Sequence, residues 1–499
     1  MINREKLYLS DYITKENVEQ WNSKLGRKKE IIIQAPTGIG KSHFIKNNLY
    51  DIAYTNNEQI LLLVNRADLK DEFKMEIEKE NKTDYITVMT YQSLEAYKEN
   101  THGELMDLSD YDYIICDESH YFFQDSLFNQ HTQESFNTIK DINSVKIFMS
   151  ATNDLFIRYL DYYKYEYELV NVDSNYDYIE NIAFFNSNSC IYEMLSECKD
   201  KNQKCIVFIQ DIEEALDLYE AFKEDSLFLC SKSNKPYYRY VDKEAKKEML
   251  KNHKFDCLFL ITTNVFENGN NILDPDLHHM IIQLNDITSI QQAIGRKRLT
   301  SDKDYLCLAI GNLDNRKLRG LIANNEKYIK CADILINEGE EVYVTSFGKD
   351  YNPIVYNTWN KKRDCVELAI NYFMYFKAKE NLLLYSSWYN DEYHVGFKKA
   401  ILKMLKKDWS DTYKLDLDYT YERDRITNIL KGYENLLLPS NFQKDLISKL
   451  NLKNDKYRII KSLNKINERL EVYKICYKIN KDRAYINRKL TRVWVVQRN

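Results

Sequence analysis

The chain is poor in glycine and proline, with 12 and 5 of them among 499 residues, and it lacks long hydrophobic runs. The apolar run from Ile60 to Val64 falls far short of the roughly 20 residues needed to cross a bilayer. The amino terminus, MINREKLYLSDYITKE, has no continuous apolar signal segment. These absences predict a soluble protein that is neither exported nor embedded in a membrane.

Closely spaced cysteines are also missing. The ten cysteines are scattered from Cys116 to Cys476 and form no C-x-x-C pair. Disulfide frameworks usually belong to secreted chains, and zinc sites need paired ligands. The pattern therefore predicts reduced thiols that pack in the interior of a cytoplasmic protein.

Charge is distributed unevenly along the chain. The formal net charge is −5, yet residues 451–499 contain 8 Lys and 6 Arg against 2 Asp and 2 Glu, a balance of +10. A basic end on an otherwise acidic chain is typical of nucleic-acid contact, although a solvated helical surface explains the charge alone equally well.

Short β-rich runs alternate with helical stretches between about residues 30 and 310. Runs that are apolar on both faces indicate strands of a parallel sheet covered by helices on each side. The polar, Tyr-rich segment 161–181 separates the runs into two groups, so we expect two α/β domains at residues 1–165 and 180–315. The nine predicted strands are EIIIQA, QILLLVN, YITVMTY, DYIICD, VKIFMS, KCIVFIQ, CLFLITT, HHMIIQL and YLCLAIG.

Beyond residue 315 the pattern becomes helical. Ile459, Leu463, Ile466 and Leu470 recur at helical spacing, and the following AYINRKLTRVWVVQ alternates polar and apolar residues like a hairpin. We expect a helical accessory region at 316–440 and a basic module resembling a winged helix at 441–499.

The segment IIIQAPTGIGKS predicts a phosphate-binding loop between a strand and a helix. Its glycines, Gly38 and Gly40, allow backbone N–H groups to curl around a phosphate. Lys41 would reach the β and γ phosphates of a nucleotide, and Ser42 would bind Mg²⁺. The predicted nucleotide-binding residues of the loop are Ala35, Pro36, Thr37, Gly38, Ile39, Gly40, Lys41 and Ser42.

The segment YDYIICDESH carries two adjacent carboxylates at the end of an apolar strand. Ligands bind at the carboxyl ends of strands in open α/β sheets. Asp117 is the expected second Mg²⁺ ligand, and Glu118 is placed to orient or deprotonate an attacking water.

These motifs occur in an order that resembles the superfamily 2 helicases of the DExH-box type. The resemblance covers residues 30–310 and implies two tandem RecA-like domains that use ATP and Mg²⁺ and act on nucleic acid. Motifs I to VI correspond to APTGIGKS (35–42), LLLVNRADL (61–69, motif Ia), DESH (117–120), SAT (150–152), CIVFIQD (205–211), TTNVFENGNNI (262–272) and QQAIGRKR (291–298).

The resemblance implies further roles by position. His120, Ser150 and Thr152 would couple ATP hydrolysis to movement on nucleic acid. From the second domain, Gln292 would act across the interface, and Arg296 and Arg298 would stabilise charge on the γ-phosphate. The remaining residues implied are Gly269 at the nucleotide, and Arg66, Thr90 and Thr263 at the nucleic-acid backbone.

Two departures from the family pattern stand out. Arg296 and Arg298 flank only Lys297, whereas most members separate the two arginines by two residues and would have the second at Leu299. This spacing resembles herpesvirus-type origin-binding and mobile-element helicases. In motif V, Asn271 replaces the Asp of many members.

Three functions remain open on this basis. One is an ATP-dependent DNA helicase or translocase, with the basic end holding DNA. The second is a sequence-specific replication-origin-binding factor that uses ATP as a switch. The third is an RNA helicase, since both backbones present the same phosphates.

Overall fold

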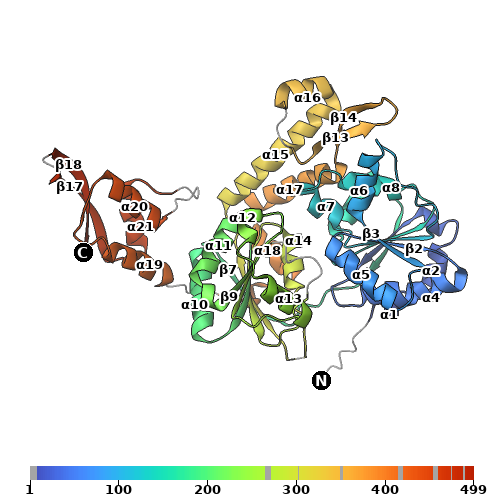
Figure 1. Cartoon of the computed structure of the whole chain (residues 1–499), viewed down its shortest axis with the longest axis horizontal. Helices are drawn as coiled ribbons and strands as arrows, with labels where there is room; N and C mark the ends of the chain where they lie inside the picture. Colours follow the sequence, from blue (N-terminus) through green and yellow to red (C-terminus); the bar gives the residue numbers. More distant parts are fainter. Residues whose placement is uncertain are drawn as a thin grey trace.

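The computed structural model describes residues 8–263, 271–301, 303–348, 352–413, 420–452, 459–473, 475–486 and 489–498. Two parallel sheets with helices on both faces form the body of the molecule, and helices connect them to a separate C-terminal module (Figure 1). Within the described residues no helix is both long enough and apolar enough to span a bilayer.

The first domain is built on six parallel strands in the order β3-β2-β4-β5-β1-β6. Successive side chains of a strand enter opposite faces, so Ile31 and Ile33 join one hydrophobic core and Ile32 joins the other. The strands are β1 (Glu30–Gln34), β2 (Ile60–Val64), β3 (Ile86–Thr90), β4 (Tyr113–Asp117), β5 (Val145–Ser150) and β6 (Tyr167–Asn171).

Helices cover both faces of this sheet (Figure 1). They are α1 (Leu9–Tyr12), α2 (Lys15–Trp21), α3 (Lys41–His43), the π-helical turn Phe44–Leu49, α4 (Tyr50–Asn56), α5 (Ala67–Lys79), α6 (Tyr91–Asn100), α7 (Tyr121–Gln124), α8 (Thr132–Ile139) and α9 (Asp154–Tyr163).

The second domain has seven parallel strands in the order β15-β7-β12-β11-β8-β10-β9. The strands are β7 (Ile179–Phe185), β8 (Lys204–Ile209), β9 (Ser226–Leu229), β10 (Phe259–Thr262), β11 (Leu277–Gln283), β12 (Leu306–Gly311) and β15 (Thr412–Tyr413). Its helices are α10 (Ser189–Asp200), α11 (Ile212–Ala221), α12 (Lys235–Tyr238), α13 (Lys243–Asn252) and α14 (Ile287–Ile294).

All nine strands predicted from apolar runs are present, as β1–β5, β8 and β10–β12. The predicted domain limits need correction. Strand β6 lies beyond the expected end of the first domain at residue 165, yet it pairs with β1. Its sequence YELVN mixes polar and apolar residues, as expected for a half-exposed edge strand, and so it gave no apolar run.

Helix α17 (Tyr372–Tyr389) joins the two domains through their cores. Phe373 and Phe376 pack in a core of the first domain, while Tyr385 and Trp388 pack in the core of the second. Figure 1 shows α17 beside α15 between the two sheets. Movement of one domain relative to the other must therefore act on this helix.

The region before α17 is only partly helical, contrary to expectation. Helices α15 (Asn315–Glu338) and α16 (Glu340–Phe347) are followed by an antiparallel hairpin, β13 (Val355–Asn360) and β14 (Cys365–Ile370). The hairpin docks on the first domain, where Tyr356 Oη donates to Glu134 Oε1 at 2.6 Å. The sequence of these strands showed no apolar strand pattern, because the hairpin is stabilised by its contacts with the first domain.

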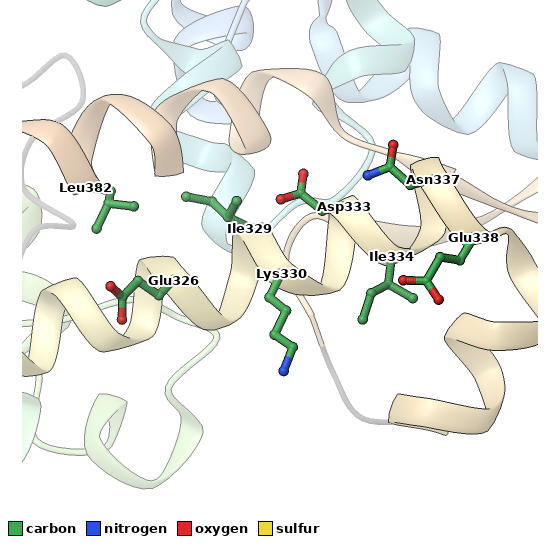
Figure 2. Close-up of a pocket in the computed structure, with 8 residues that line it drawn as sticks. All are labelled: Glu326, Ile329, Lys330, Asp333, Ile334, Asn337, Glu338 and Leu382. Atoms are coloured by element: carbon green, nitrogen blue, oxygen red, sulfur yellow. The ribbon is translucent and has the colours of Figure 1, made fainter.

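A shallow groove of about 390 Å³ runs along α15, and Leu382 of α17 contributes to its lining (Figure 2). None of the predicted site residues lines it, so this groove is separate from the candidate active site. Its lining residues are Glu326, Ile329, Lys330, Asp333, Ile334, Asn337, Glu338 and Leu382.

The C-terminal module follows α18 (Gly396–Met404) and β15 and has its own hydrophobic core. Its helix-strand-helix-helix-strand-strand order and its sheet order β16-β18-β17 match a winged helix. The elements are α19 (Thr420–Lys431), β16 (Leu437–Leu438), α20 (Ser440–Leu450), α21 (Leu463–Val472), β17 (Tyr477–Ile486) and β18 (Lys489–Arg498).

This module begins earlier than the predicted residue 441, because α19 and β16 belong to it. Ile426 and Leu430 of α19 are fully buried in its core. Ile459, predicted on the last helix, lies before α21 and is 42% exposed. In Figure 1 the module lies beside α10, on the side of the second domain away from the first.

Candidate active site

The predicted phosphate loop forms the turn from β1 into α3. Gly38 and Gly40 both have a φ of +90°, a left-handed conformation that side chains with a Cβ rarely adopt. Their presence in a glycine-poor chain is thus explained by the backbone. Of the loop residues, Ala35 is buried, Pro36 and Ile39 are half-buried and Ser42 is exposed.

The loop is held from three directions. The Ala35 N–H donates to the Ser150 carbonyl at 3.0 Å, and Lys41 Nζ donates to the Ala35 carbonyl at 3.2 Å. The Leu9 N–H donates to the Ile39 carbonyl at 2.9 Å. The loop is therefore preorganised, with the Lys41 ammonium folded back over it.

Asp117 and Glu118 lie at the carboxyl end of β4, as predicted. Glu118 has a φ of +49°, an uncommon conformation for a residue with a side chain and one associated with functional sites. Tyr91 Oη donates to the Asp117 carbonyl at 2.9 Å, which fixes the end of the strand.

The two carboxyl groups have opposite protonation tendencies. Burial and the adjacent Glu118 raise the pKa of Asp117 to about 7. Burial also opposes ionisation of Glu118, but Lys41 and the hydrogen bond with His120 outweigh it and hold the pKa of Glu118 below its usual range. Glu118 is therefore the ionised member of the pair.

A chain of polar contacts leads from Glu118 to the second domain. His120 Nδ1 lies 3.3 Å from Glu118 Oε2 and 3.0 Å from Ser150 Oγ. The Thr152 N–H donates to Ser150 Oγ at 3.0 Å, and Gln292 Nε2 on α14 donates to Thr152 Oγ1 at 3.3 Å. The structure thus brings motifs II, III and VI into one network.

The phosphate loop itself also contacts the second domain. A Cβ on Gly38 would lie 3.1 Å from Arg298 Nη1, and Thr37 Oγ1 donates to the Gly295 carbonyl at 3.4 Å. Arg298 Nε donates to Asn271 Oδ1 at 2.8 Å. Burial and the neighbouring Arg296 lower the pKa of Arg298 to about 10, so this guanidinium is held in a poorly hydrated place.

The unusual arginine spacing has a structural explanation. Residues 296–298 run beside Ile272, whose N–H donates to the Arg296 carbonyl at 2.8 Å and whose carbonyl accepts from the Arg298 N–H at 2.9 Å. Alternate side chains of such an extended segment point the same way. Arg296 and Arg298 both act on Glu118 electrostatically, while Lys297 turns inward and donates to the Asp274 carbonyl at 2.5 Å.

The residues expected at nucleic acid differ in accessibility. Arg66 follows β2, is about half exposed and forms an ion pair with Asp125 at 2.8 Å. Thr90 is 8% exposed and caps α6 by accepting the Ser93 N–H, and Thr263 is 6% exposed. Gly269 lies outside the described residues.

The sequence did not reveal a second contact between the domains. Gln124 at the end of α7 donates through Nε2 to Asp286 Oδ2 at 2.8 Å, and Asp286 caps the helix that carries Gln292. Lys377 of α17 donates to Gln124 Oε1 at 2.9 Å and is buried. The accessory helix is therefore part of the network.

Asn153 is another polar residue that sequence reasoning missed. Its Nδ2 donates to the Ile33 carbonyl at 3.2 Å, and its Oδ1 accepts from Ser119 Oγ at 2.8 Å. It ties β1 and the DESH turn together beneath the phosphate loop. Its position directly after the SAT motif was the available clue.

Two family models match parts of the chain. The type III restriction enzyme, res subunit, family matches residues 10–155, and the helicase conserved C-terminal domain matches residues 186–298. The two matches fall on the two sheets whose facing residues form the network, and together they span slightly more than half of the chain.

Both α/β domains of the chain therefore match family models, the second of them a helicase domain. Helicases of the matched families use ATP with a divalent metal ion.

Several solved helicases resemble this chain in part. Mss116p bound to ssRNA and AMP-PNP is 13% identical with a TM-score of 0.43, covering 95% of this chain and 96% of that one. Dbp5 of S. cerevisiae bound to RNA and ADP BeF3 is 15% identical with a TM-score of 0.41, covering 57% and 79%. MrfA bound to DNA and AMPPNP is 16% identical with a TM-score of 0.43, covering 62% and 49%.

One curated protein is similar over part of its length. A phosphatidylinositol 4-phosphate 5-kinase of Plasmodium falciparum (isolate 3D7) is 26% identical over 259 residues, which is 50% of this chain. The helicase chain spans only 14% of the length of that protein.

Proposed function

We propose that this helicase translocates along DNA and separates its strands, hydrolysing ATP with Mg²⁺ between the two domains. The observation that supports this most strongly is the continuous set of contacts from Glu118 through His120, Ser150 and Thr152 to Gln292. A nucleotide held by residues of both domains can bias their relative positions, which is what a motor requires.

Each residue of the site has a part in this proposal. The loop amides and Lys41 bind the phosphates, and Glu118, ionised at neutral pH, orients the attacking water and accepts its proton. Arg296 and Arg298 approach from the second domain and stabilise negative charge on the γ-phosphate. Closure of the domains brings these groups together, and phosphate release separates them.

The residues present fit a magnesium ion. Asp117 and Ser42 supply one carboxylate and one hydroxyl, the small oxygen set that Mg²⁺ uses together with nucleotide phosphates and water. The raised pKa of the buried Asp117 is relieved by a cation, which favours its ionised form. Asp117 and Ser42 would hold the ion, which would supply positive charge against the nucleotide phosphates. No cluster of three or more His, Cys, Asp or Glu side chains that could hold a metal ion occurs among the described residues.

The first test is the Lys41→Ala variant, with ATP turnover measured alone and with single-stranded DNA, duplex DNA and RNA. We expect turnover to fall about 100-fold or more, because the phosphates lose their main positive partner. Lys24→Ala, at an exposed lysine of the same domain, is the control and should match the unmodified chain. Undiminished, DNA-stimulated turnover in Lys41→Ala would refute the proposed motor, and stimulation by RNA alone would favour an RNA helicase.

A second candidate is a sequence-specific replication-origin-binding factor that uses ATP as a switch. The winged-helix topology of residues 420–498 supports it, since a helix in the major groove reads base edges. Binding to defined and random duplexes separates the two functions. Equal affinity for all sequences would exclude the second candidate.

A further inference from the structure

Among the described residues of the C-terminal module, positive charge is concentrated on the hairpin β17 and β18, here called the wing. Helix α21, the helix that a winged helix would place in the major groove, is electrically balanced, with Lys465 and Arg469 against Glu468 and Glu471. The wing has Asp482 as its single acidic residue in the two strands, against the cations Lys478, Lys481, Arg483, Lys489, Arg492 and Arg498.

The register of the wing gathers cations and apolar groups on one face. Arg483 lies directly opposite Arg492, and Tyr485 lies opposite Leu490. Opposed residues share a face, and alternate residues along a strand return to it, so Lys481 joins them. Tyr485 is 77% exposed and Leu490 is 51% exposed.

This face changes character along the hairpin. Near its base, Tyr477 and Ile479 are buried in the core of the module together with Val496. Beyond Ile479, Trp494 still packs against the core opposite Lys481, and the face then leaves the core, with the cations Lys481, Arg483 and Arg492 exposed. Like charges directly opposed across a strand pair are destabilising. Among the described residues neither Arg483 nor Arg492 has an acidic partner, so an external anion would relieve their repulsion.

We propose that the outer face of the wing binds single-stranded nucleic acid, with Lys481, Arg483 and Arg492 on the phosphates and the Tyr485–Leu490 pair on an unstacked base. The inference rests on the proposed function and specifies where the strand is held. Cations that follow a backbone combined with an exposed aromatic ring are the features that bind single strands without reading sequence. A duplex covers its base faces, so it would leave the apolar pair exposed.

The test uses full-length chains and fluorescent oligothymidylate, with an abasic strand of equal length as the second probe. The first variant, R483Q/R492Q, removes two charges from the proposed face. K478Q/K489Q removes two charges from the opposite face of the same hairpin and is its matched control. The third variant is Tyr485→Ala, and thermal unfolding checks that every variant is folded.

We expect R483Q/R492Q to weaken binding of both probes and to lower the slope of log affinity against log salt by about 1.4, at about 0.7 for each lost phosphate contact. Tyr485→Ala should weaken binding of oligothymidylate about tenfold and leave the abasic strand unaffected, because only a base can stack on the ring. K478Q/K489Q should keep the slope of the unmodified chain.

Equal losses in R483Q/R492Q and K478Q/K489Q would overturn the proposal, as would equal binding of both probes by Tyr485→Ala and the unmodified chain. A parallel series with oligouridylate distinguishes DNA from RNA as the strand. Failure of the wing is separable from failure of the motor. The wing proposal is refuted if the unmodified chain binds single strands and the wing variants bind them equally well. The motor proposal is refuted if nucleic acid does not change the ATP turnover of the unmodified chain.

Discussion

Asn271 determines how the Arg298 guanidinium is held, because its Oδ1 accepts the Arg298 Nε at 2.8 Å. Many family members have Asp at this position. A neutral amide positions the arginine without neutralising it, whereas a carboxylate would form a stronger charge-assisted bond. Asn271, the unusual residue of motif V, therefore contacts Arg298, the arginine with the unusual spacing in motif VI.

We expect Asn271→Asp to lower kcat for ATP about tenfold, since the carboxylate would compete with the γ-phosphate for Arg298. Steady-state turnover at saturating ATP measures the effect. Asn271→Gln keeps the neutral amide, so its kcat should fall less than that of Asn271→Asp. An unchanged kcat in Asn271→Asp would show that Arg298 does not reach the nucleotide.

Glu30, at the start of β1, is a buried acid remote from the nucleotide. Its nearest cation, Lys146 Nζ, lies 3.9 Å away, and burial raises the pKa of Glu30 to about 7. The folded state therefore binds the proton more tightly than the unfolded state, whose carboxyl titrates near 4.5. The stability this gives is complete below pH 4.5 and is lost as the pH rises through 7.

Glu30→Gln should remove this pH dependence. The unfolding free energy of the variant relative to the unmodified chain should rise between pH 5 and pH 8, by at most about 3 kcal/mol. Denaturant unfolding at both pH values measures it. Glu166→Gln, at an exposed position, serves as the control, and a difference that does not change with pH would contradict the raised pKa.

At the scale of elements, α17 connects the accessory region to the nucleotide site through one buried lysine. Lys377 Nζ donates to the Phe123 carbonyl at 3.2 Å and to Gln124 Oε1 at 2.9 Å. Gln124 in turn donates to Asp286 of the second domain. These hydrogen bonds connect α17 with residues of both domains.

Lys377→Met should reduce stimulation of ATP turnover by nucleic acid several-fold while the chain remains folded. The Phe123 carbonyl and Gln124 Oε1 would each lose a donor, which costs stability, so the loss of stimulation is compared with the change in melting temperature. Turnover with and without oligonucleotide, together with the melting temperature, measures them. Lys379→Met, on the same helix beside the Tyr375 ring, should keep full stimulation.

Elements differed in how far the sequence could predict them. Buried strands such as β1 and β4, and the loop and acids that follow them, were predicted because local composition and glycine chemistry determine them. Strands β6 and β15 and the β13–β14 hairpin were not, since tertiary pairing rather than apolar content stabilises them. The Gln124–Asp286 contact joins residues 162 positions apart and left no local pattern.

At the scale of the whole molecule, the winged-helix module is separable and the two α/β domains are not. The module has its own core, whereas α17 contributes to the cores of both domains. The short β15, residues 412–413, still belongs to the second sheet. A natural boundary for a truncated chain therefore follows residue 413.

A chain of residues 1–413 should fold and retain ATP turnover in the absence of nucleic acid, but it should bind strands more weakly and with a smaller salt dependence. Calorimetric unfolding, turnover and binding titrations measure these properties. A chain of residues 1–311 is the comparison and should unfold at a much lower temperature. Similar melting of the two chains would show that α17 is dispensable.

The shared helix also limits how such a motor can be recombined. Phe373 packs in a core of the first domain, and Trp388 packs in the core of the second. A graft that exchanges one domain between residues 171 and 179 would therefore leave an unfilled space in one hydrophobic core and a poorly fitting side chain in the other. A functional chimera therefore has to take residues 372–413 and both α/β domains from the same parent protein.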